Sequence, residues 1–234
     1  METGDPGFAE YLDRWLHSRP SPRMGELTAA AGGPAGVGIF CTDMIEGFAR
    51  IGNLASPRIE GIIPALVGMF RRAHEAGVQT FVLTQDSHPA DSPQFEQYGP
   101  HCITGTPEAE TIRELRELPF ADELLIIPKQ TLNPALFSKL TPWLELYGVP
   151  PVAIVCGNCT DLCVYQLGMA LRTWAVGKGQ RVRVVAPMDC IETYDLPTEV
   201  ATRQSLTPHP ADFLHRVFLY HLGLNGVEVV AGIT

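Results

Sequence analysis

The sequence has no long apolar stretch. None of its apolar runs approaches the roughly 18 consecutive residues that a helix needs to cross a bilayer, so we expect no membrane span. Residues 1–20 are acidic and lack the charged-then-apolar layout of a secretory signal. We therefore expect a cytoplasmic protein that does not bind a membrane.

Positive charge is also scarce. The 17 lysine and arginine residues are outnumbered by 26 aspartate and glutamate residues, which gives a formal net charge of −9. Proteins bind nucleic acids largely through the phosphates and need a basic face to do so. We therefore expect no nucleic-acid partner.

The six cysteines are too few, in a chain of 234 residues, to indicate a disulfide-stapled secreted scaffold. Four of them, Cys41, Cys102, Cys156 and Cys190, sit in or beside apolar segments, where a free thiol behaves as a small apolar side chain. Cys156 and Cys159 form a C-x-x-C pair at the end of a predicted strand, but no second pair accompanies it. We therefore interpret this pair as neither a zinc motif nor a redox motif.

Apolar runs and helical stretches alternate along the chain. The runs are nearly continuous, as expected for strands buried on both faces. They cover residues 36–42, 78–84, 123–128, 151–157, 181–187 and 226–232. Helices are predicted over residues 57–76, 134–147, 161–176 and 208–222. This alternation predicts a three-layer α/β/α fold with a six-stranded parallel sheet.

Punctuating residues support two of these helices. Gly77 follows the first predicted helix and is a suitable C-terminal stop. Asn133 and Pro134 supply a cap and a first-turn proline for the second helix.

Two segments break the alternation. Residues 1–35 form an N-terminal extension to a domain of residues 36–234, and we expect a short helix and a Gly/Pro/Ala-rich tether there. This extension is expected to pack on the domain or to contact a neighbouring chain in a homo-oligomer. Residues 86–107 form a long loop dense in Pro, Gly, His and Asp. Loops of this length in compact domains are usually functional or disordered, and its histidines and aromatic residues favour function.

Residues with reactive side chains follow four of the predicted strands. In an open parallel sheet, ligands bind beyond the carboxyl ends of the strands. Asp43 follows the first strand, Asp86 and His88 follow the second, Lys129 follows the third, and the run 157–163 follows the fourth. An acid, an amine, a thiol and possible metal ligands are therefore expected at one edge of the sheet.

Cys163 is the candidate nucleophile of this set. It is predicted to lie in the first turn of a helix that Thr160 and Asp161 would cap, where the helix dipole and a neighbouring lysine would lower the thiol pKa. Asp43 could accept the thiol proton if burial raised its pKa, and Lys129 would tune both charges. Each residue also has a plain alternative: a buried structural cysteine, a strand-end cap and a surface lysine.

Asp86, His88 and His101 are candidate metal ligands. Side chains alternate along an extended segment, so the pattern Asp86-x-His88 places two ligands on the same side. His101 could complete the set from the other end of the same loop. One carboxylate and two imidazoles suit a divalent cation, Zn²⁺ first, with Fe²⁺ or Mn²⁺ as alternatives.

Three sequence elements resemble the isochorismatase-like cysteine hydrolases. The first is Asp43 followed five positions later by Phe48, the second is Lys129, and the third is the run Thr160-Asp161-Leu162-Cys163-Val164. The order of these elements is that of the family, and the resemblance extends from about residue 36 to the C-terminus.

The resemblance implies a catalytic triad of Asp43, Lys129 and Cys163. It also implies a cis peptide bond between Asn158 and Cys159. The backbone N–H groups of Cys159 and Cys163 would form the oxyanion hole.

Within this family, the loop resembles that of nicotinamidases. The pattern is Asp86-Ser87-His88 followed by Pro100-His101-Cys102-Ile103-Thr104-Gly105-Thr106. The segments 195–197 and 208–210 are similar to the plant-type branch. The implied activity is hydrolysis of nicotinamide to nicotinate and ammonia through a cysteine thioester, in NAD salvage.

The resemblance also implies how the ring is held, and it includes departures. A metal would bind the pyridine nitrogen while Phe48 and Tyr98 sandwich the ring. Ser92 stands where some nicotinamidases have a further histidine, so a water is expected to replace that ligand. Glu46 and Gly47 stand where Asn and Asp are common.

Two other functions remain open at this stage. One keeps the triad but acts on another small amide, such as a ureido or carbamoyl compound. The other is a non-enzymatic relative that serves as an oligomeric binding or scaffold protein; the presence of all three triad residues argues against it.

Overall fold

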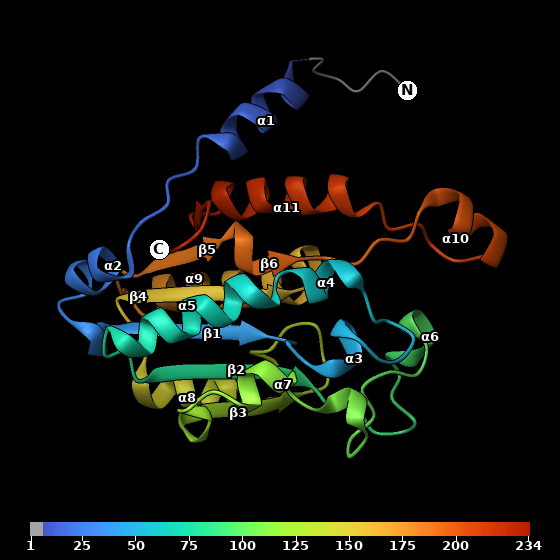
Figure 1. The fold of residues 1–234 in the computed structure, drawn as a ribbon, viewed down its shortest axis with the longest axis horizontal. Coiled ribbons are helices and arrows are strands. Elements are labelled where there is room, and N and C mark those ends of the chain that lie inside the picture. The colour runs from blue at the N-terminus through green and yellow to red at the C-terminus, as the bar shows by residue number, and fades with distance from the viewer. Residues whose placement is uncertain (1–6) are drawn as a thin grey trace.

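A seven-stranded parallel sheet forms the centre of the protein, and the computed structural model describes residues 7–234 (Figure 1). The strand order is β3-β2-β1-β4-β5-β7, and the short β6 pairs with β4. The strands are β1 Val37–Thr42, β2 Thr80–Asp86, β3 Leu124–Lys129, β4 Val152–Asn158, β5 Arg183–Pro187, β6 Ile191–Glu192 and β7 Glu228–Val230. The predicted three-layer fold is confirmed, with β6 as an additional strand.

The strand interiors explain why the apolar runs were continuous. Every residue of β1 and of β4 is buried, because helices cover both faces of the sheet at its centre. β3 lies at one edge, where Leu125 and Ile126 are exposed. Glu192 ends the two-residue β6, which has too few residues to show a periodic pattern and was missed for that reason.

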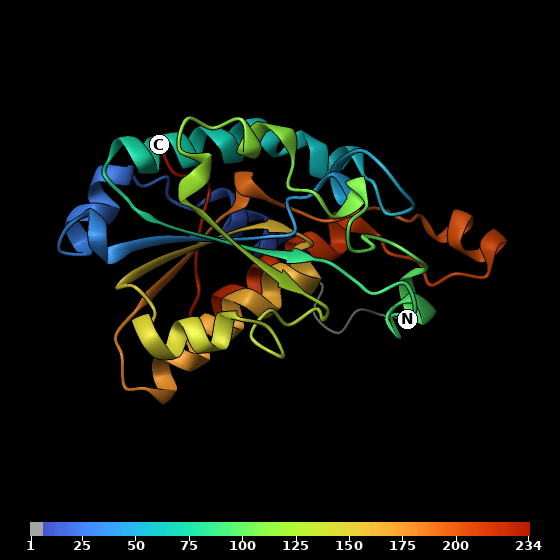
Figure 2. The same cartoon turned by 90° about the horizontal axis from the view of Figure 1, so that it is seen from below.

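Helices pack on both faces of the sheet (Figure 2). The α-helices are α1 Phe8–His17, α2 Met24–Ala30, α3 Glu46–Ala49, α4 Pro57–Gly61, α5 Ile63–Glu75, α6 Phe95–Tyr98, α7 Arg113–Arg116, α8 Leu140–Tyr147, α9 Tyr165–Gly177, α10 Thr198–Gln204 and α11 Ala211–Leu224. Short 3-10 helices cover Pro34–Gly36, Pro107–Ala109, Ala121–Glu123 and Met188–Cys190, and a π-helical turn covers Thr160–Val164. α2 and α5 pack on one face, and α8, α9 and α11 on the other.

Three of the predicted helices differ in extent. The first divides at Ile62 into α4 and α5, and Gly77 follows its end with a φ of 87°. The second begins only at Leu140, because the side chain of Asn133 accepts a hydrogen bond from the N–H of Ala135 and closes a turn there. The last begins at Ala211.

The segment before α11, for which no helix was predicted, contains α10. We call residues 195–210 the α10 arm. Its ends are paired, since the backbones of Leu196 and His209 exchange two hydrogen bonds. The arm extends away from the sheet at the right of Figure 1.

The described part of the N-terminal extension, residues 7–35, holds two α-helices rather than one. Trp15 of α1 packs edge-on against Tyr220 of α11, with 5.2 Å between ring centroids. Met24 and Leu27 of α2 are buried in the core on one face of the sheet. The extension therefore packs on the body of the protein, as expected; the domain boundary at residue 35 stays a prediction. No helix among residues 7–234 has the length and apolar content to cross a bilayer.

Candidate active site

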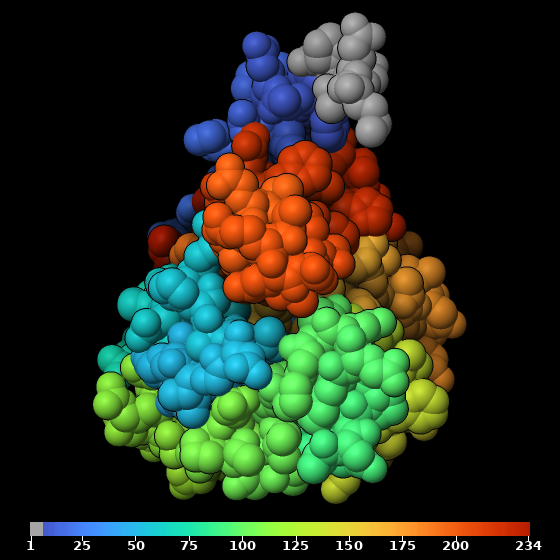
Figure 3. Space-filling view, turned by 90° about the vertical axis from the view of Figure 1, so that its right-hand side faces the viewer, coloured from blue at the N-terminus to red at the C-terminus, as the bar shows by residue number. Residues whose placement is uncertain are grey.

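A cavity opens at the carboxyl ends of the central strands. Around it, Figure 3 shows the region of α3, the 86–107 loop and the α10 arm meeting on one face, in light blue, green and orange. Most of the lining residues are apolar or aromatic, and the rest are polar or charged. The lining residues are Asp43, Phe48, Leu54, Asp86, Gln94, Tyr98, His101, Leu132, Asn158, Cys159, Leu162, Cys163 and Tyr194.

Asp43 sits directly after β1 with a left-handed φ of 56°, uncommon for a residue with a side chain. Its N–H donates to the carbonyl of Thr84, and its Oδ1 accepts from the N–H of Asp86 at 2.8 Å. The carboxyl is therefore fixed against β2. Burial, together with the charge of Asp86, raises the pKa of Asp43 to about 6 even though Lys129 opposes the shift.

Lys129 is the last residue of β3, and its side chain is fully buried. Its Nζ lies 2.8 Å from Oδ2 of Asp43 and 2.6 Å from Oδ1 of Asp86. It also lies 3.5 Å from Sγ of Cys163. Burial acts to lower the pKa of Lys129, but the two carboxylates outweigh it and raise the pKa well above its usual range. The ammonium group therefore stays charged and joins the acid to the thiol.

Cys163 lies in the Cys163 turn, which we define as residues 158–164. The expectation of a lowered thiol pKa is wrong. Burial raises the pKa of Cys163 well above its usual value, and Asp43 adds to this, although Lys129 acts in the opposite direction. The thiol is 4% exposed, so the loss of solvation outweighs the neighbouring cation. Burial therefore favours the neutral thiol of Cys163, and forming a thiolate there would require a base.

The expected capping pair is also absent. The turn ends in a π-helical segment, Thr160–Val164, whose start has no side-chain cap. Thr160 Oγ1 instead lies 2.7 Å from Nδ1 of His215. Asp161 accepts from Thr193 Oγ1 at 2.6 Å and bonds Nε2 of His209 at 2.8 Å. Both polar side chains therefore tie the turn to the segment that follows β5.

The cis peptide bond between Asn158 and Cys159 is present, as the family resemblance implied. Asn158 Nδ2 donates to the carbonyl of Asp43 at 2.6 Å. This hydrogen bond links the end of β4 to the end of β1 and so fixes the acid and the turn relative to each other. Cys159 and Cys163 both line the cavity.

Asp86, His88 and His101 come together as predicted. All three are buried, and the ligand atoms that they offer lie within 4.8 Å of one another. His88 Nε2 is 3.5 Å and His101 Nε2 is 3.9 Å from Oδ2 of Asp86. The geometry brings one carboxylate and two imidazoles to one point.

The surroundings of the two imidazoles favour metal binding. His101 Nδ1 lies 2.8 Å from the carbonyl of Gly99, which must accept, so Nε2 is left as a free lone pair. Within residues 7–234, neither ring nitrogen of His88 has a hydrogen-bond partner, although both are buried. Buried polar atoms without a partner need an explanation, and a cation provides one. The donor set fits a divalent metal.

The 86–107 loop is held by backbone pairing rather than left free. The N–H of His88 donates to the carbonyl of Cys102, and the N–H of Thr104 donates to the carbonyl of His88. Glu108 accepts from the N–H of Cys102 at 2.9 Å, where Cys102 has a φ of 46°. The two ends of the loop are therefore joined, and His101 is carried next to Asp86.

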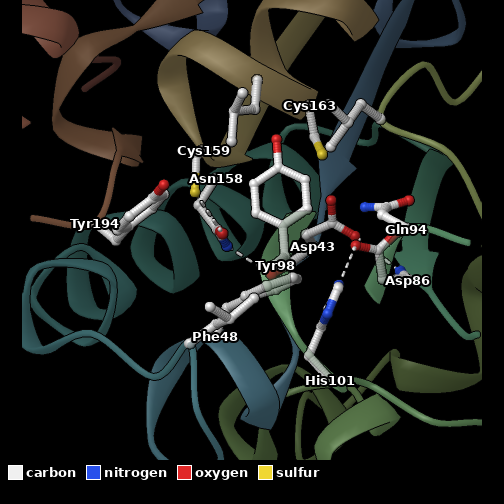
Figure 4. Close-up of a pocket in the computed structure, with 13 residues that line it drawn as sticks. Asp43, Phe48, Asp86, Gln94, Tyr98, His101, Asn158, Cys159, Cys163 and Tyr194 are labelled. Atoms are coloured by element: carbon white, nitrogen blue, oxygen red, sulfur yellow. Dashed lines mark hydrogen bonds and ion pairs between the residues drawn. The ribbon is translucent and has the colours of Figure 1, made fainter. Parts of the chain in front are cut away.

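Aromatic side chains form much of the cavity wall (Figure 4). Phe48 and Tyr98, both predicted from the resemblance, face the cavity with ring centroids 6.0 Å and 6.2 Å from that of His101. Tyr194 lies on the other side, near Cys159. Tyr194 and Gln94 also line the cavity, and neither was predicted from the sequence. Only the neighbouring segment 195–197, which resembled the plant-type branch, pointed near Tyr194.

The residues that departed from the family pattern have structural roles. Glu46 does not line the cavity; its carboxylate accepts from the N–H of Arg113 and pairs with Arg50 at 3.3 Å. A side chain at Gly47 would meet the carbonyl oxygen of Glu108 at 2.7 Å and Sγ of Cys102 at 2.9 Å. The two residues therefore contact the segments that hold the 86–107 loop in place.

Comparison with known proteins agrees with this geometry. The sequence matches the Isochorismatase domain over residues 37–211. It is 29% identical over 217 residues to Nicotinamidase 1 of Arabidopsis thaliana, covering 85% of this chain and 86% of that relative.

Two solved structures share the fold. The pyrazinamidase of Pyrococcus horikoshii, in complex with zinc, has a TM-score of 0.60 at 24% identity and covers 83% of this chain and 98% of its own. The N-carbamoylsarcosine amidase of Thermoplasma acidophilum has a TM-score of 0.58 at 19% identity, covering 83% and 95%. The fold is therefore common to amidases whose substrates differ.

The chain belongs to the isochorismatase family. Within it, the chain is a hydrolase with a nicotinamidase among its relatives.

Proposed function

We propose that this protein hydrolyses nicotinamide to nicotinate and ammonia, a reaction of NAD salvage, with Asp43, Lys129 and Cys163 as its catalytic residues. One observation carries the proposal: a single buried ammonium group contacts the carboxylate of Asp43, the carboxylate of Asp86 and the thiol of Cys163. It joins a base, a nucleophile and a metal-ligand set beside one aromatic cavity.

The first half of the reaction forms a thioester. Asp43, which is mostly ionised near neutral pH because its pKa is about 6, removes the proton of Cys163. The thiolate sulfur attacks the carboxamide carbon, and the negative charge moves to the carboxamide oxygen. We assign the backbone N–H groups of Cys159 and Cys163 to this oxyanion. Asp43 then donates its proton to the departing nitrogen, the C–N bond breaks, and ammonia leaves.

The second half hydrolyses the thioester. Asp43, again a carboxylate, removes a proton from a water molecule that attacks the thioester carbon. The C–S bond breaks, nicotinate leaves, and Cys163 recovers its proton from Asp43. Lys129 remains protonated throughout and keeps Asp43 close to the pKa that both proton transfers need.

Asp86, His88 and His101 are the residues that would hold a divalent metal ion, Zn²⁺ first and Fe²⁺ or Mn²⁺ as alternatives. The unpartnered nitrogens of His88 and the free Nε2 of His101 support this assignment. A bound cation would supply a Lewis acid that holds and polarises the ring of the substrate. Phe48 and Tyr98 would contact the two faces of that ring.

The test is ammonia release from nicotinamide by the purified protein. Cys163→Ala is expected to lower turnover by roughly 10³-fold or more while retaining bound metal. Cys190→Ala is a matched control, because Cys190 is equally buried but does not line the cavity. Near-normal turnover by Cys163→Ala would exclude the covalent scheme.

The alternative substrate is decided in the same assay. Ureido and carbamoyl amides are tested beside nicotinamide, since an amidase of that type shares the fold. Release from those amides alone, with the metal content measured, would replace nicotinamide as the substrate. A homo-oligomer and a cytoplasmic location stay predictions, which light scattering and cell fractionation address.

A further inference from the structure

His209, the centre of the Pro208-His209-Pro210 motif, takes no part in the chemistry above but lies buried beside it. Its Nε2 is 2.8 Å from Oδ2 of Asp161, and its side chain is 10% exposed. Asp161 stands two positions before Cys163 in the Cys163 turn. One side of the imidazole therefore contacts the turn that carries the nucleophile.

The other side of His209 contacts a wall of the cavity. Its Nδ1 lies 2.8 Å from the carbonyl of Tyr194, and the two rings stack at 3.8 Å between centroids with an interplanar angle of 14°. Tyr194 lines the cavity opposite His101 (Figure 4). The imidazole is thus the layer directly behind this aromatic wall.

The acceptors around His209 define which atoms donate. A backbone carbonyl can only accept a hydrogen bond, and the same is true of an ionised carboxylate. Both ring nitrogens of His209 therefore donate, one to Tyr194 and one to Asp161. Two donated bonds in opposite directions fix the plane of the imidazole, and stacking then fixes the plane of the tyrosine ring.

The backbone adds a second attachment. The N–H of His209 donates to the carbonyl of Leu196, and the N–H of Leu196 donates back, at 2.8 Å and 2.9 Å. Thr193 Oγ1 donates to Asp161 at 2.6 Å. The segment 193–196 is therefore held on both sides of Tyr194, and His209 joins these attachments to the Cys163 turn.

We propose that His209 is a positioning residue that holds Tyr194 as a flat wall of the cavity that Cys163 also lines, and so makes the cavity select planar ring amides over open-chain amides. This inference deepens the proposed function, and the first of its two tests, which measures the kinetics of nicotinamide hydrolysis, rests on that function. A second arm uses the reactivity of Cys163 and does not depend on nicotinamide.

The reactivity arm compares two alkylating probes. Iodoacetanilide carries a planar ring and iodoacetamide does not, and peptide mass spectrometry measures how fast each one modifies Cys163. The ratio of the two rates reports on the aromatic wall. We expect Tyr194→Leu and His209→Phe to lower this ratio roughly three- to tenfold, the size of a lost aromatic contact. Tyr194→Leu keeps the backbone carbonyl that His209 contacts, so it tests the wall with the imidazole in place.

His74→Phe is the matched control. His74 also stacks on an aromatic ring, that of Phe120 at 3.9 Å, and also faces a carboxylate, that of Glu123 at 3.3 Å. It does not line the cavity. Its ratio is expected to stay within about twofold of the wild type, as for a substitution at an independent site.

The kinetic arm asks whether His209 acts through Tyr194. The glutamine side chain of His209→Gln cannot stack on Tyr194 as the imidazole does. We expect this substitution to raise KM for nicotinamide more than it lowers kcat, where kcat is divided by the fraction of protein whose Cys163 can be alkylated. In a Tyr194→Leu background, the same substitution should change KM by no more than about twofold, because its target has been removed. A purely structural role would instead leave the two substitutions additive.

The outcomes separate the two proposals. An unchanged probe ratio in Tyr194→Leu, or a full effect of His209→Gln on KM in the Tyr194→Leu background, would overturn the positioning role. In a further outcome, the wild type does not hydrolyse nicotinamide while Tyr194→Leu and His209→Phe still lower the ratio of the two alkylation rates. That pair of results would overturn the proposed function and support the positioning role.

Discussion

The ammonium group of Lys129 lies 2.8 Å from Oδ2 of Asp43, and neither side chain is more than 1% exposed. A buried charge of this kind is tolerated only when its partners stay in place, because removing one partner leaves the other unpaired in a poorly solvated site. Here the cation has two carboxylate partners, Asp43 and Asp86, which repel each other without it.

Lys129→Met is therefore expected to destabilise the protein as well as inactivate it. The substitution keeps the apolar stem but leaves two buried carboxylates side by side, which should lower the free energy of unfolding by about 3–5 kcal/mol. Urea unfolding of the chelator-treated protein measures this. Lys178→Met, where the cation lies 5.2 Å over the exposed side of Trp174, is the control and should change stability by about 0.5 kcal/mol or less. Equal stability of the two variants would contradict the buried pairing.

His101→Ala should weaken metal binding. It removes one of three clustered donors, and changes around a metal site typically lower affinity by about 10- to 100-fold. Competition with a chromogenic chelator gives the affinity for Zn²⁺, Fe²⁺ and Mn²⁺ in turn. His74→Ala is the control and should bind like the wild type. Unchanged affinity in His101→Ala would remove His101 from the ligand set.

The pair His209–Asp161 should make stability depend on pH. Burial lowers the pKa of His209, but the hydrogen bond to Asp161 outweighs it and the net shift is upward. Burial raises the pKa of Asp161, but His209 and Thr193 outweigh it and the net shift is downward. The contribution of His209 is thus complete below its unfolded pKa of about 6.5 and is lost as pH rises through the higher folded value. The contribution of Asp161 is complete above about pH 3.9 and is lost as pH falls through the lower folded value.

The stability difference between the wild type and His209→Gln is accordingly expected to be largest between about pH 4 and 6.5 and smaller at about pH 9. A charge-assisted hydrogen bond sets its size at about 1.5–3 kcal/mol. Urea unfolding at several pH values measures the difference. A difference that stays constant across this range would show that the pair is not charged.

Gly47→Ala should disturb the support of the 86–107 loop. The added carbon would approach the carbonyl oxygen of Glu108 at 2.7 Å and Sγ of Cys102 at 2.9 Å. Overpacking of this kind costs about 1–3 kcal/mol, and the metal site next to Cys102 should weaken with it. Gly61→Ala is the control, since the added carbon would meet no described atom within 4 Å apart from its chain neighbours and the backbone of its own helix. Thermal unfolding and the chelator assay give both effects; equal results for the two variants would contradict the crowding.

Much of the fold and of the candidate site could be predicted because both follow from strand ends. Continuous apolar runs located six strands, and parallel strands bring their carboxyl ends to one edge. Asp43, Asp86 and Lys129 could therefore be placed together from the sequence. His101 came from the loop motif, and the structure places it within 4.8 Å of the other two ligand donors.

What could not be predicted depends on burial and on irregular backbone. The thiol pKa of Cys163 was expected to fall, but the depth at which a side chain is buried is not written in local sequence. Tyr194 was missed because the two-residue β6 that precedes it has no periodic pattern. The start of α8 was misplaced because Asn133 closes a turn with its side chain rather than capping a helix.

The short strand β6 also makes the cavity depend on residues far along the chain from Asp43. It pairs with the end of β4 through Gly157 and Asn158, and it leads directly into Thr193 and Tyr194. Asp43, Lys129 and Cys163 all precede α9 in the sequence, whereas Tyr194 of the cavity wall follows β6. Completing the cavity therefore requires residues from the last fifth of the chain, which are translated after all three reactive groups.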